Sequence, residues 1–138
     1  MSSTLFVDAI EPNLSSGVHI AGHVIQVVSN YYAPSGMIQG TNTSFVSMGA
    51  AFELSITPKF SNSLILIDVL ISMAHVPSGT GLMHTITKAG IPMNTPTYGS
   101  YYHISGTSLN MYGPVTLQES GVAGSTSAIT YGVSFRVD

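Results

Sequence analysis

The chain contains no cysteine and no tryptophan among its 138 residues. The absence of cysteine excludes disulfides, thiolate chemistry and cysteine-ligated zinc. Charge is almost as scarce, because Asp, Glu, Lys and Arg make up 7% of the sequence, with three basic and six acidic side chains and a net charge of −3. An average protein carries about 25% charged residues. Since each neutralised phosphate needs its own Lys or Arg, this composition argues against nucleic acid as a partner.

Long apolar runs are also missing. The most hydrophobic stretch is "LILIDVLI", residues 64–71, which is far too short to cross a bilayer as a helix. We therefore expect no membrane insertion. A chain of 138 residues has the length of one domain that can bury a substantial core.

Strand signals occur along most of the chain, and no segment has a convincing helical pattern. Apolar residues recur at period two, β-branched and aromatic residues dominate, and Gly, Pro, Asn and Ser interrupt the runs. The predicted strands are Val24–Ser29, Thr43–Met48, Ala51–Thr57, Leu64–Met73, Leu82–Lys88, Ile91–Asn94, Tyr101–Ser105, Ser108–Pro114 or slightly beyond, and Ala128–Val137. Residues 23–138 are thus predicted to form an all-β, antiparallel two-sheet β-sandwich or jelly roll, with a tight hairpin at Lys88-Ala89-Gly90.

Residues 1–22 differ from the rest and are predicted to form an extended N-terminal arm outside the sandwich. Their apolar run contains Leu5, Phe6, Val7 and Ile10, and no second run lies close enough to pair with it as a hairpin. An isolated apolar strand gains little in water, but it satisfies its backbone groups when it is added to the sheet edge of another protein. The arm is therefore a candidate attachment segment.

The predicted strand Leu64–Met73 has two apolar faces. Ile65, Ile67, Val69, Ile71 and Met73 share one face, while Leu64, Leu66 and Leu70 lie on the other with Asp68 and Ser72. One face of an antiparallel sheet meets the sandwich core, and the other normally contacts water. The leucine side therefore needs a second cover: a neighbouring subunit is the simplest, and the chain's own loops or arm are the alternative, with Asp68 then buried or half-buried and hydrogen-bonded.

Four segments of the sequence resemble β-sandwich domains of tailed-phage virion proteins, such as tail fibres. They are "GHVIQVVS" (22–29), "TSFVSMGAAFELSITPKFSNSLILIDV" (43–69), "TKAG" (87–90) and "AITYGVSFRVD" (128–138). The resemblance covers about residues 22–138, and the arm resembles segments that precede such domains. It implies a virion protein with a jelly-roll-like sandwich. It leaves the position on the particle open, because this fold serves fibres, capsid decorations and adaptors.

Histidine could in principle supply metal ligands. The five histidines are His19, His23, His75, His84 and His103, and none falls at a ligand spacing. His19 and His23 are four residues apart, which in an extended arm separates them by roughly 13 Å. We therefore expect no metal site and no cofactor, although an ion on an oligomer axis remains an alternative.

Catalytic motifs are similarly weak. The sequence has no Gly-x-Ser-x-Gly elbow. Glycoside hydrolysis requires two carboxylates, and the candidates within the sandwich, Glu53, Asp68 and Glu119, are isolated in the sequence. We expect that the protein is not an enzyme.

Aromatic and amide side chains gather in one stretch bordered by Gly and Ser. They are Tyr98, Tyr101, Tyr102, His103, Asn110 and Tyr112. Such groups cover a sandwich edge or a subunit interface, which is the favoured interpretation. Alternatively, they stack on sugars and hydrogen-bond their hydroxyls, as a ligand surface does. The same two interpretations apply to Tyr31 and Tyr32.

Together these features predict a phage virion structural protein. We expect a homotrimer with Leu64, Leu66, Asp68 and Leu70 in the subunit interface, anchored to other virion proteins by its arm. Since one small domain leaves no length for a shaft, a capsid decoration (cement) protein or a short fibre is favoured. The alternative is a tail-fibre or receptor-binding adhesion module that recognises a host surface glycan or protein.

Overall fold

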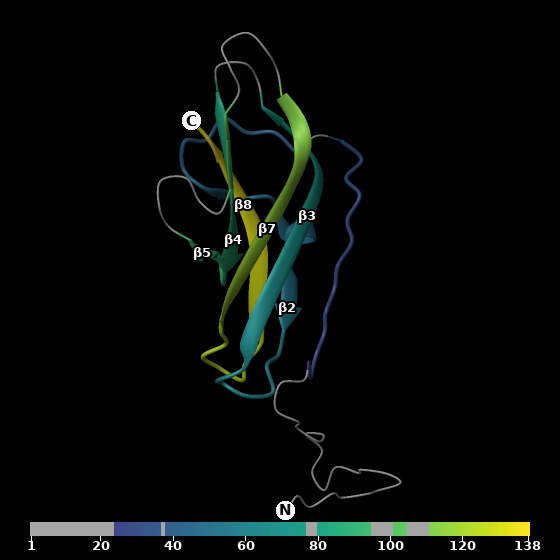
Figure 1. Cartoon of the computed structure of the whole chain (residues 1–138), viewed down its shortest axis with the longest axis vertical. Coiled ribbons are helices and arrows are strands. Elements are labelled where there is room, and N and C mark those ends of the chain that lie inside the picture. The colour runs from purple at the N-terminus through teal and green to yellow at the C-terminus, as the bar shows by residue number, and fades with distance from the viewer. Residues whose placement is uncertain (1–23, 37, 77–79, 95–100, 105–110) are drawn as a thin grey trace, which may run out of the picture.

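The computed structural model describes residues 24–36, 38–76, 80–94, 101–104 and 111–138, and their regular structure is β-strand apart from one short 3-10 turn (Figure 1). The elements are β1 (Val46–Ser47), η1 (Ala50–Phe52), β2 (Leu54–Ile56), β3 (Leu64–Val76), β4 (Gly81–Lys88), β5 (Ile91–Pro92), β6 (Tyr101–Ile104), β7 (Met111–Val122) and β8 (Ile129–Val137). The attachment residues Leu5, Phe6, Val7 and Ile10, and the rest of the predicted arm, lie outside the described residues.

The strands form two antiparallel sheets, which confirms the predicted fold class. The larger sheet has the order β1-β8-β4-β5, with β2 also pairing with β8 and β6 also pairing with β4. The smaller sheet consists of β3 and β7 alone. Figure 1 shows the β3–β7 pair crossing in front of β8 and β4, so the two sheets form the layers of a sandwich.

The core lies between the layers and follows the alternation of each strand. Side chains of β3, β4, β7 and β8 meet there, and the most buried include Ile65, Ile86, Val115, Leu117, Ile129 and Val133. A β-bulge interrupts the pairing of β3 with β7: the register of the two strands shifts between Ile71 and Ala74. Pro114 falls at this shift, where its missing N–H removes no regular ladder hydrogen bond.

The outer face of the larger sheet is covered by the chain itself. Met83 is fully buried there, because the Arg136 guanidinium lies over it, with Nε 2.9 Å from the Met83 sulfur. Arg136 also donates to the Thr43 carbonyl at 3.2 Å and lies 5.5 Å from the centre of the Phe45 ring, a cation–π contact. The scarce cations are therefore used structurally.

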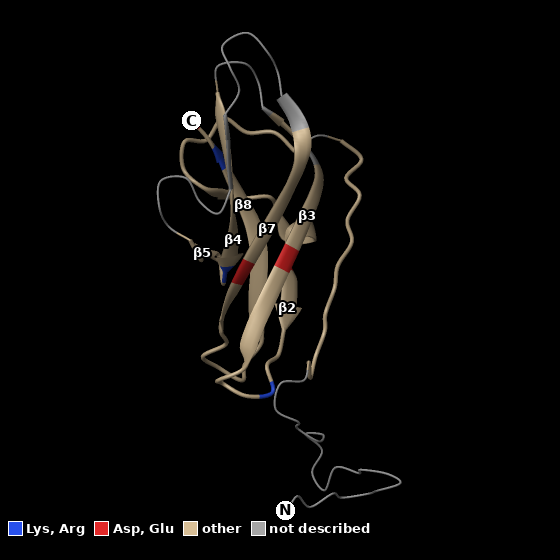
Figure 2. Cartoon of the chain, in the orientation of Figure 1, with Lys and Arg blue, Asp and Glu red and all other residues tan. Residues whose placement is uncertain are grey.

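Lys88 joins the two layers at the opposite end of β4. Its Nζ donates to the carbonyls of Val122 at 3.1 Å and Ala123 at 2.8 Å, both at the end of β7. Figure 2 shows how widely the few charged residues are spaced over the sandwich. In the described part of the chain, the third cation, Lys59, is exposed near the start of the β2–β3 connection.

Several strand predictions need correction. Thr43–Met48 is strand only at Val46–Ser47, and Ile91–Asn94 only at Ile91–Pro92. Val24–Ser29 is not a strand in the structure. Ala51–Thr57 begins as the turn η1, with the Phe52 N–H bonded to the Gly49 carbonyl at 2.9 Å, and only Leu54–Ile56 pairs with β8. β7 continues to Val122, well past the predicted Pro114, because the bulge tolerates the proline. The predicted Lys88–Gly90 hairpin is confirmed: Ala89 and Gly90 have φ values of 51° and 79°, as a type I′ turn requires.

Two isoleucines on the adjacent strands β4 and β5 differ in burial and provide a test of the core. Ile86 on β4 is fully buried, whereas Ile91 on β5 is 69% exposed. We expect Ile86→Ala to lower the free energy of unfolding by about 2–5 kcal/mol through lost burial and a residual cavity. Ile91→Ala should change it by less than about 0.5 kcal/mol. Urea denaturation of both variants measures this, and equal losses would contradict the described core.

Candidate interaction surface

The outward side of the β3–β7 pair exposes an apolar surface, called here the leucine face and consisting of Leu64, Leu66, Leu70 and Val122. Leu64 and Leu70 are each 73% exposed, Leu66 is 63% exposed and Val122 is 58% exposed. Leu64 pairs directly with Val122 across the two strands. The predicted second apolar face of β3 is therefore real, and none of the described residues covers it.

Asp68 is the carboxylate within the leucine face. Asp68 is exposed. The sequence predicts a buried or half-buried carboxylate if the chain's own loops or arm cover the face, and the observed exposure corrects that expectation. Its cross-strand partner is Gln118, whose Nε2 donates to Asp68 Oδ1 at 2.6 Å. A carboxylate that already accepts a hydrogen bond costs less to remove from water than a free one. Asp68 is thus compatible with a contact on this face.

An extended segment, residues 24–36, joins no sheet and lies on the side of the sandwich near β3 in the view of Figure 1. Its side chains are unusually exposed for apolar residues: Val24 is 80% exposed, Val27 is 79% exposed and Tyr31 is 90% exposed. Two contacts fasten it to η1. Asn30 Nδ2 donates to the Ala51 carbonyl at 3.0 Å, and the Tyr32 ring meets the Phe52 ring edge-on at 5.1 Å.

The aromatic stretch maps to one end of the sandwich. Tyr101, Tyr102 and His103 belong to β6, which pairs with the first residues of β4. Tyr112 belongs to the start of β7, where it pairs with His75 near the end of β3. The backbone therefore brings these residues to the same end of the two layers. Tyr98 and Asn110 lie outside the described residues, as do His19 and His23.

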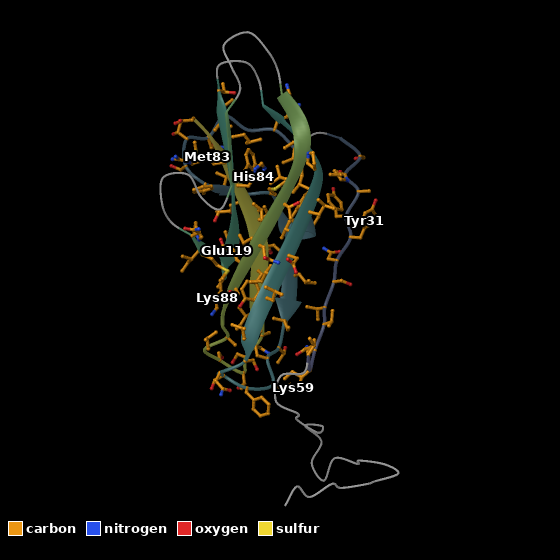
Figure 3. The ribbon with its side chains drawn as sticks, in the orientation of Figure 1. Tyr31, Lys59, Met83, His84, Lys88 and Glu119 are labelled. Carbon is orange, nitrogen blue, oxygen red and sulfur yellow. The ribbon has the colours of Figure 1, made fainter. Side chains whose placement is uncertain are left out.

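The carboxylates considered for catalysis are separated by the fold. Glu53 lies beside Gly132 of β8, where its Cγ is 3.1 Å from the position that a Cβ on Gly132 would occupy. Asp68 is on the leucine face, and Glu119 is opposite Ile67 on the other side of the β3–β7 pair. Figure 3 shows Glu119 over the middle of the sandwich and His84 closer to one end. Within the residues described, no three His, Cys, Asp or Glu side chains cluster as metal ligands would.

Burial affects one titratable group clearly. Tyr131 of β8 lies in the core, and its removal from water raises the pKa of the phenol above the ordinary value of 10.0. Burial disfavours the phenolate, so Tyr131 acts as a neutral core residue. No helix in the described part of the chain is long and apolar enough to cross a membrane.

Comparisons of this chain with family models, with curated proteins and with solved structures find no match. The structure therefore defines the class as an all-β sandwich. Its surface geometry and the sequence resemblance remain as the basis for a functional proposal.

The leucine face yields a direct test. If it is an intersubunit contact, Leu66→Asp should weaken self-association at least tenfold, because an unpaired charge would enter a dry interface. Ile91→Asp is the matched control, since Ile91 is 69% exposed but lies on β5 of the other sheet. Light scattering at micromolar concentration measures the mass, and circular dichroism checks the fold. A wild-type monomer, or equal effects of the two substitutions, would show that this face makes no subunit contact.

Proposed function

We propose that this protein is a structural component of a bacteriophage virion, either a capsid-surface decoration (cement) protein or a short fibre. In this proposal it assembles as a homotrimer through the leucine face and is anchored to other virion proteins by residues 1–22. The observation that carries it is the open apolar side of β3, whose three leucines are 63–73% exposed in one chain. An isolated soluble chain rarely exposes such a contiguous patch without a partner.

Two further features support a role in assembly. The three basic and six acidic side chains produce little electrostatic repulsion between copies. The described carboxylates do not converge on one site, and two of the three cations, Lys88 and Arg136, bond to the chain's own carbonyls. These groups hold the sandwich together, which fits a structural protein. The resemblance of residues 22–138 to virion domains of tailed phages supports the same class.

The second candidate function is an adhesion module, and one geometric observation favours it. β6 and the start of β7, which carry Tyr101, Tyr102, His103 and Tyr112, share one end of the sandwich. Segment 24–36 begins at the opposite end, beside the β2–β3 connection (Figure 1). A chain anchored through residues 1–22 would thus present its aromatic end outward, where side chains of this kind can stack on a host glycan.

Deleting residues 2–20 tests the anchor. We expect the truncated protein to remain folded and soluble, because the described sandwich begins after this segment. It should no longer bind phage particles that lack the native protein, since the apolar strand available for addition to another sheet is gone. Occupancy on purified particles, measured by quantitative gel or electron microscopy, reports the result.

Two controls sharpen this experiment. Replacing Leu5, Phe6, Val7 and Ile10 by Ser should abolish binding, whereas replacing Ser2, Ser3 and Thr4 by Ala should preserve it. Full occupancy by the truncated form would mean that attachment runs through the sandwich. Binding of the truncated form to host cells but not to particles would support adhesion as an additional role.

A further inference from the structure

We propose that residues 24–29, called here the exchange segment, pair as an added β-strand with the free edge of β3 in a second copy of this chain. The inference rests on the self-association in the proposed function. It adds which segment and which sheet edge make the contact between copies. It needs only two copies of this protein, and no other virion component.

The exchange segment has the properties of a strand without a partner. It is extended, and its backbone makes no hydrogen bond to any other described residue. Val24 and Val27 are 80% and 79% exposed. The side-chain oxygen of Gln26 is buried yet accepts no hydrogen bond within the described structure. Buried polar atoms in this condition are normally satisfied in the final assembly, and the exposed backbone groups of an extended segment can pair with another strand.

The free edge of β3 offers backbone groups that could pair with the exchange segment. β4 and β8 have neighbouring strands on both sides, whereas the one strand that pairs with β3 among the described residues is β7. Its segment Leu64–Ile71 contains no Pro or Gly and keeps a regular register. A long, apolar, unprotected strand edge is a template for another strand. Pairing with the exchange segment would satisfy both sets of backbone groups.

The other edge of the small sheet, on β7, is less suitable. β7 contains Pro114, which lacks an N–H, and also Gly113 and Gly121. Glu119 adds a charge on the side that faces the larger sheet. Proline, glycine and inward-pointing charge are features that discourage pairing at a strand edge. β3 between Leu64 and Ile71 has none of them apart from Asp68, which is bonded to Gln118.

The side chains of the exchange segment match those of β3. Both stretches lack a wet face: the segment has Val24 and Val28 on one side and Ile25 and Val27 on the other, with no charge. Strands that are apolar on both faces are normally buried on both faces. If the segment pairs with β3, one of its sides would extend the leucine face. The other side would extend the row of inward-facing side chains of β3.

The leucine face, once it is extended by the segment, presents enough apolar area for a stable contact between copies. The exposed apolar side chains of the leucine face and of the neighbouring segment are Leu64, Leu66, Leu70, Val122, Val24, Ile25, Val27, Val28, Tyr31 and Tyr32. At about 150–200 Å² for a fully exposed side chain of this size, they present on the order of 1,000 Å² per copy, compared with about 800 Å² per partner in a standard interface.

The partner strand belongs to a second copy because the segment is fastened elsewhere in its own chain. Asn30 and Tyr32, which follow the exchange segment, are held to Ala51 and Phe52 of η1. η1 leads directly into β2, which pairs with β8 in the larger sheet. The end of the segment is thus tied to the edge of the larger sheet, and none of the described residues pairs with the β3 edge of the same chain.

Disulfide trapping between differently tagged chains tests this geometry, because the natural chain has no cysteine. Val27→Cys and Leu66→Cys chains are prepared separately, mixed, allowed to exchange in mild denaturant and oxidised. Directly opposed residues in neighbouring strands approach closely enough at Cβ for a disulfide. We expect a mixed, covalently linked pair, with Leu64→Cys and Leu70→Cys scanned alongside to find the register. Thr126→Cys, in the exposed β7–β8 connection, is the control and should give no such product.

The outcomes separate this inference from the proposed function. If the wild type assembles but no β3 cysteine links to Val27→Cys of another chain, strand exchange is wrong and the proposed assembly stands. A Val27→Cys/Leu66→Cys double variant that links only within one chain overturns the inference as well. A wild-type monomer overturns both the inference and the trimer.

Proline substitutions in the exchange segment provide a second, independent readout. Val27→Pro and Val28→Pro each remove one N–H, and these point to opposite edges of an extended strand. We expect one of the two to weaken association at least tenfold, and Thr at the same positions to preserve it. The melting temperature of the dissociated chain should not change, because the segment makes no backbone hydrogen bonds there. Wild-type assembly by both proline variants would contradict the inference.

Discussion

The structure depends on the need to cover a strand that is apolar on both faces. The inner face of β3 is satisfied within one chain, where Ile65 is 8% exposed and the inward residues Val115 and Leu117 of the partner strand β7 are buried. Its outer face is not, since Leu64 and Leu70 remain 73% exposed. The larger sheet solves the same problem internally, by laying Arg136 over Met83 and against the Phe45 ring. Among the described residues the small sheet has no such cover, and this asymmetry makes its outer side the contact in the proposed assembly.

Scarcity of charge favours the proposed association. The described cations Lys88 and Arg136 donate to backbone carbonyls, so they stabilise loops and layers. Asp68, the charge within the leucine face, is bonded to Gln118 at 2.6 Å. Copies of the chain can therefore approach with little repulsion. Folding and self-association draw on the same few polar groups.

Sequence periodicity predicted the architecture well where strands are regular. The alternation in β3, β4 and β8 defined the all-β sandwich, and the double apolar pattern of β3 located the leucine face before any geometry was known. Periodicity could not show where strand partners are missing. Val24–Ser29 has a strand pattern, but pairing is a long-range property, and the segment has no ladder in one chain. The strand pattern of this segment is explained if its pairing partner is a strand in a second copy of the chain.

Local signals also misjudged two boundaries for physical reasons. Pro114 suggested the end of a strand, yet the register shift opposite it lets β7 continue to Val122. Ala51 and Phe52 fit the alternation of β2, but the residue before η1, Gly49, has a φ of 104°, and a tight turn forms there. The grouping of Tyr101, Tyr102, His103 and Tyr112 at one end arises from the pairing of β6 with β4, which sequence proximity alone does not specify.

Hydrogen exchange of β3 as a function of protein concentration tests the central claim most directly. The peptide covering Leu64–Ile71 should exchange slowly at micromolar concentration and at least tenfold faster after dilution below the dissociation constant, because its outer face and free edge lose their cover. The peptide covering β8, which has strand partners on both sides within one chain, should keep its protection throughout. If β3 is equally protected at all concentrations, the strand is complete in a single chain and the account of its second face is wrong.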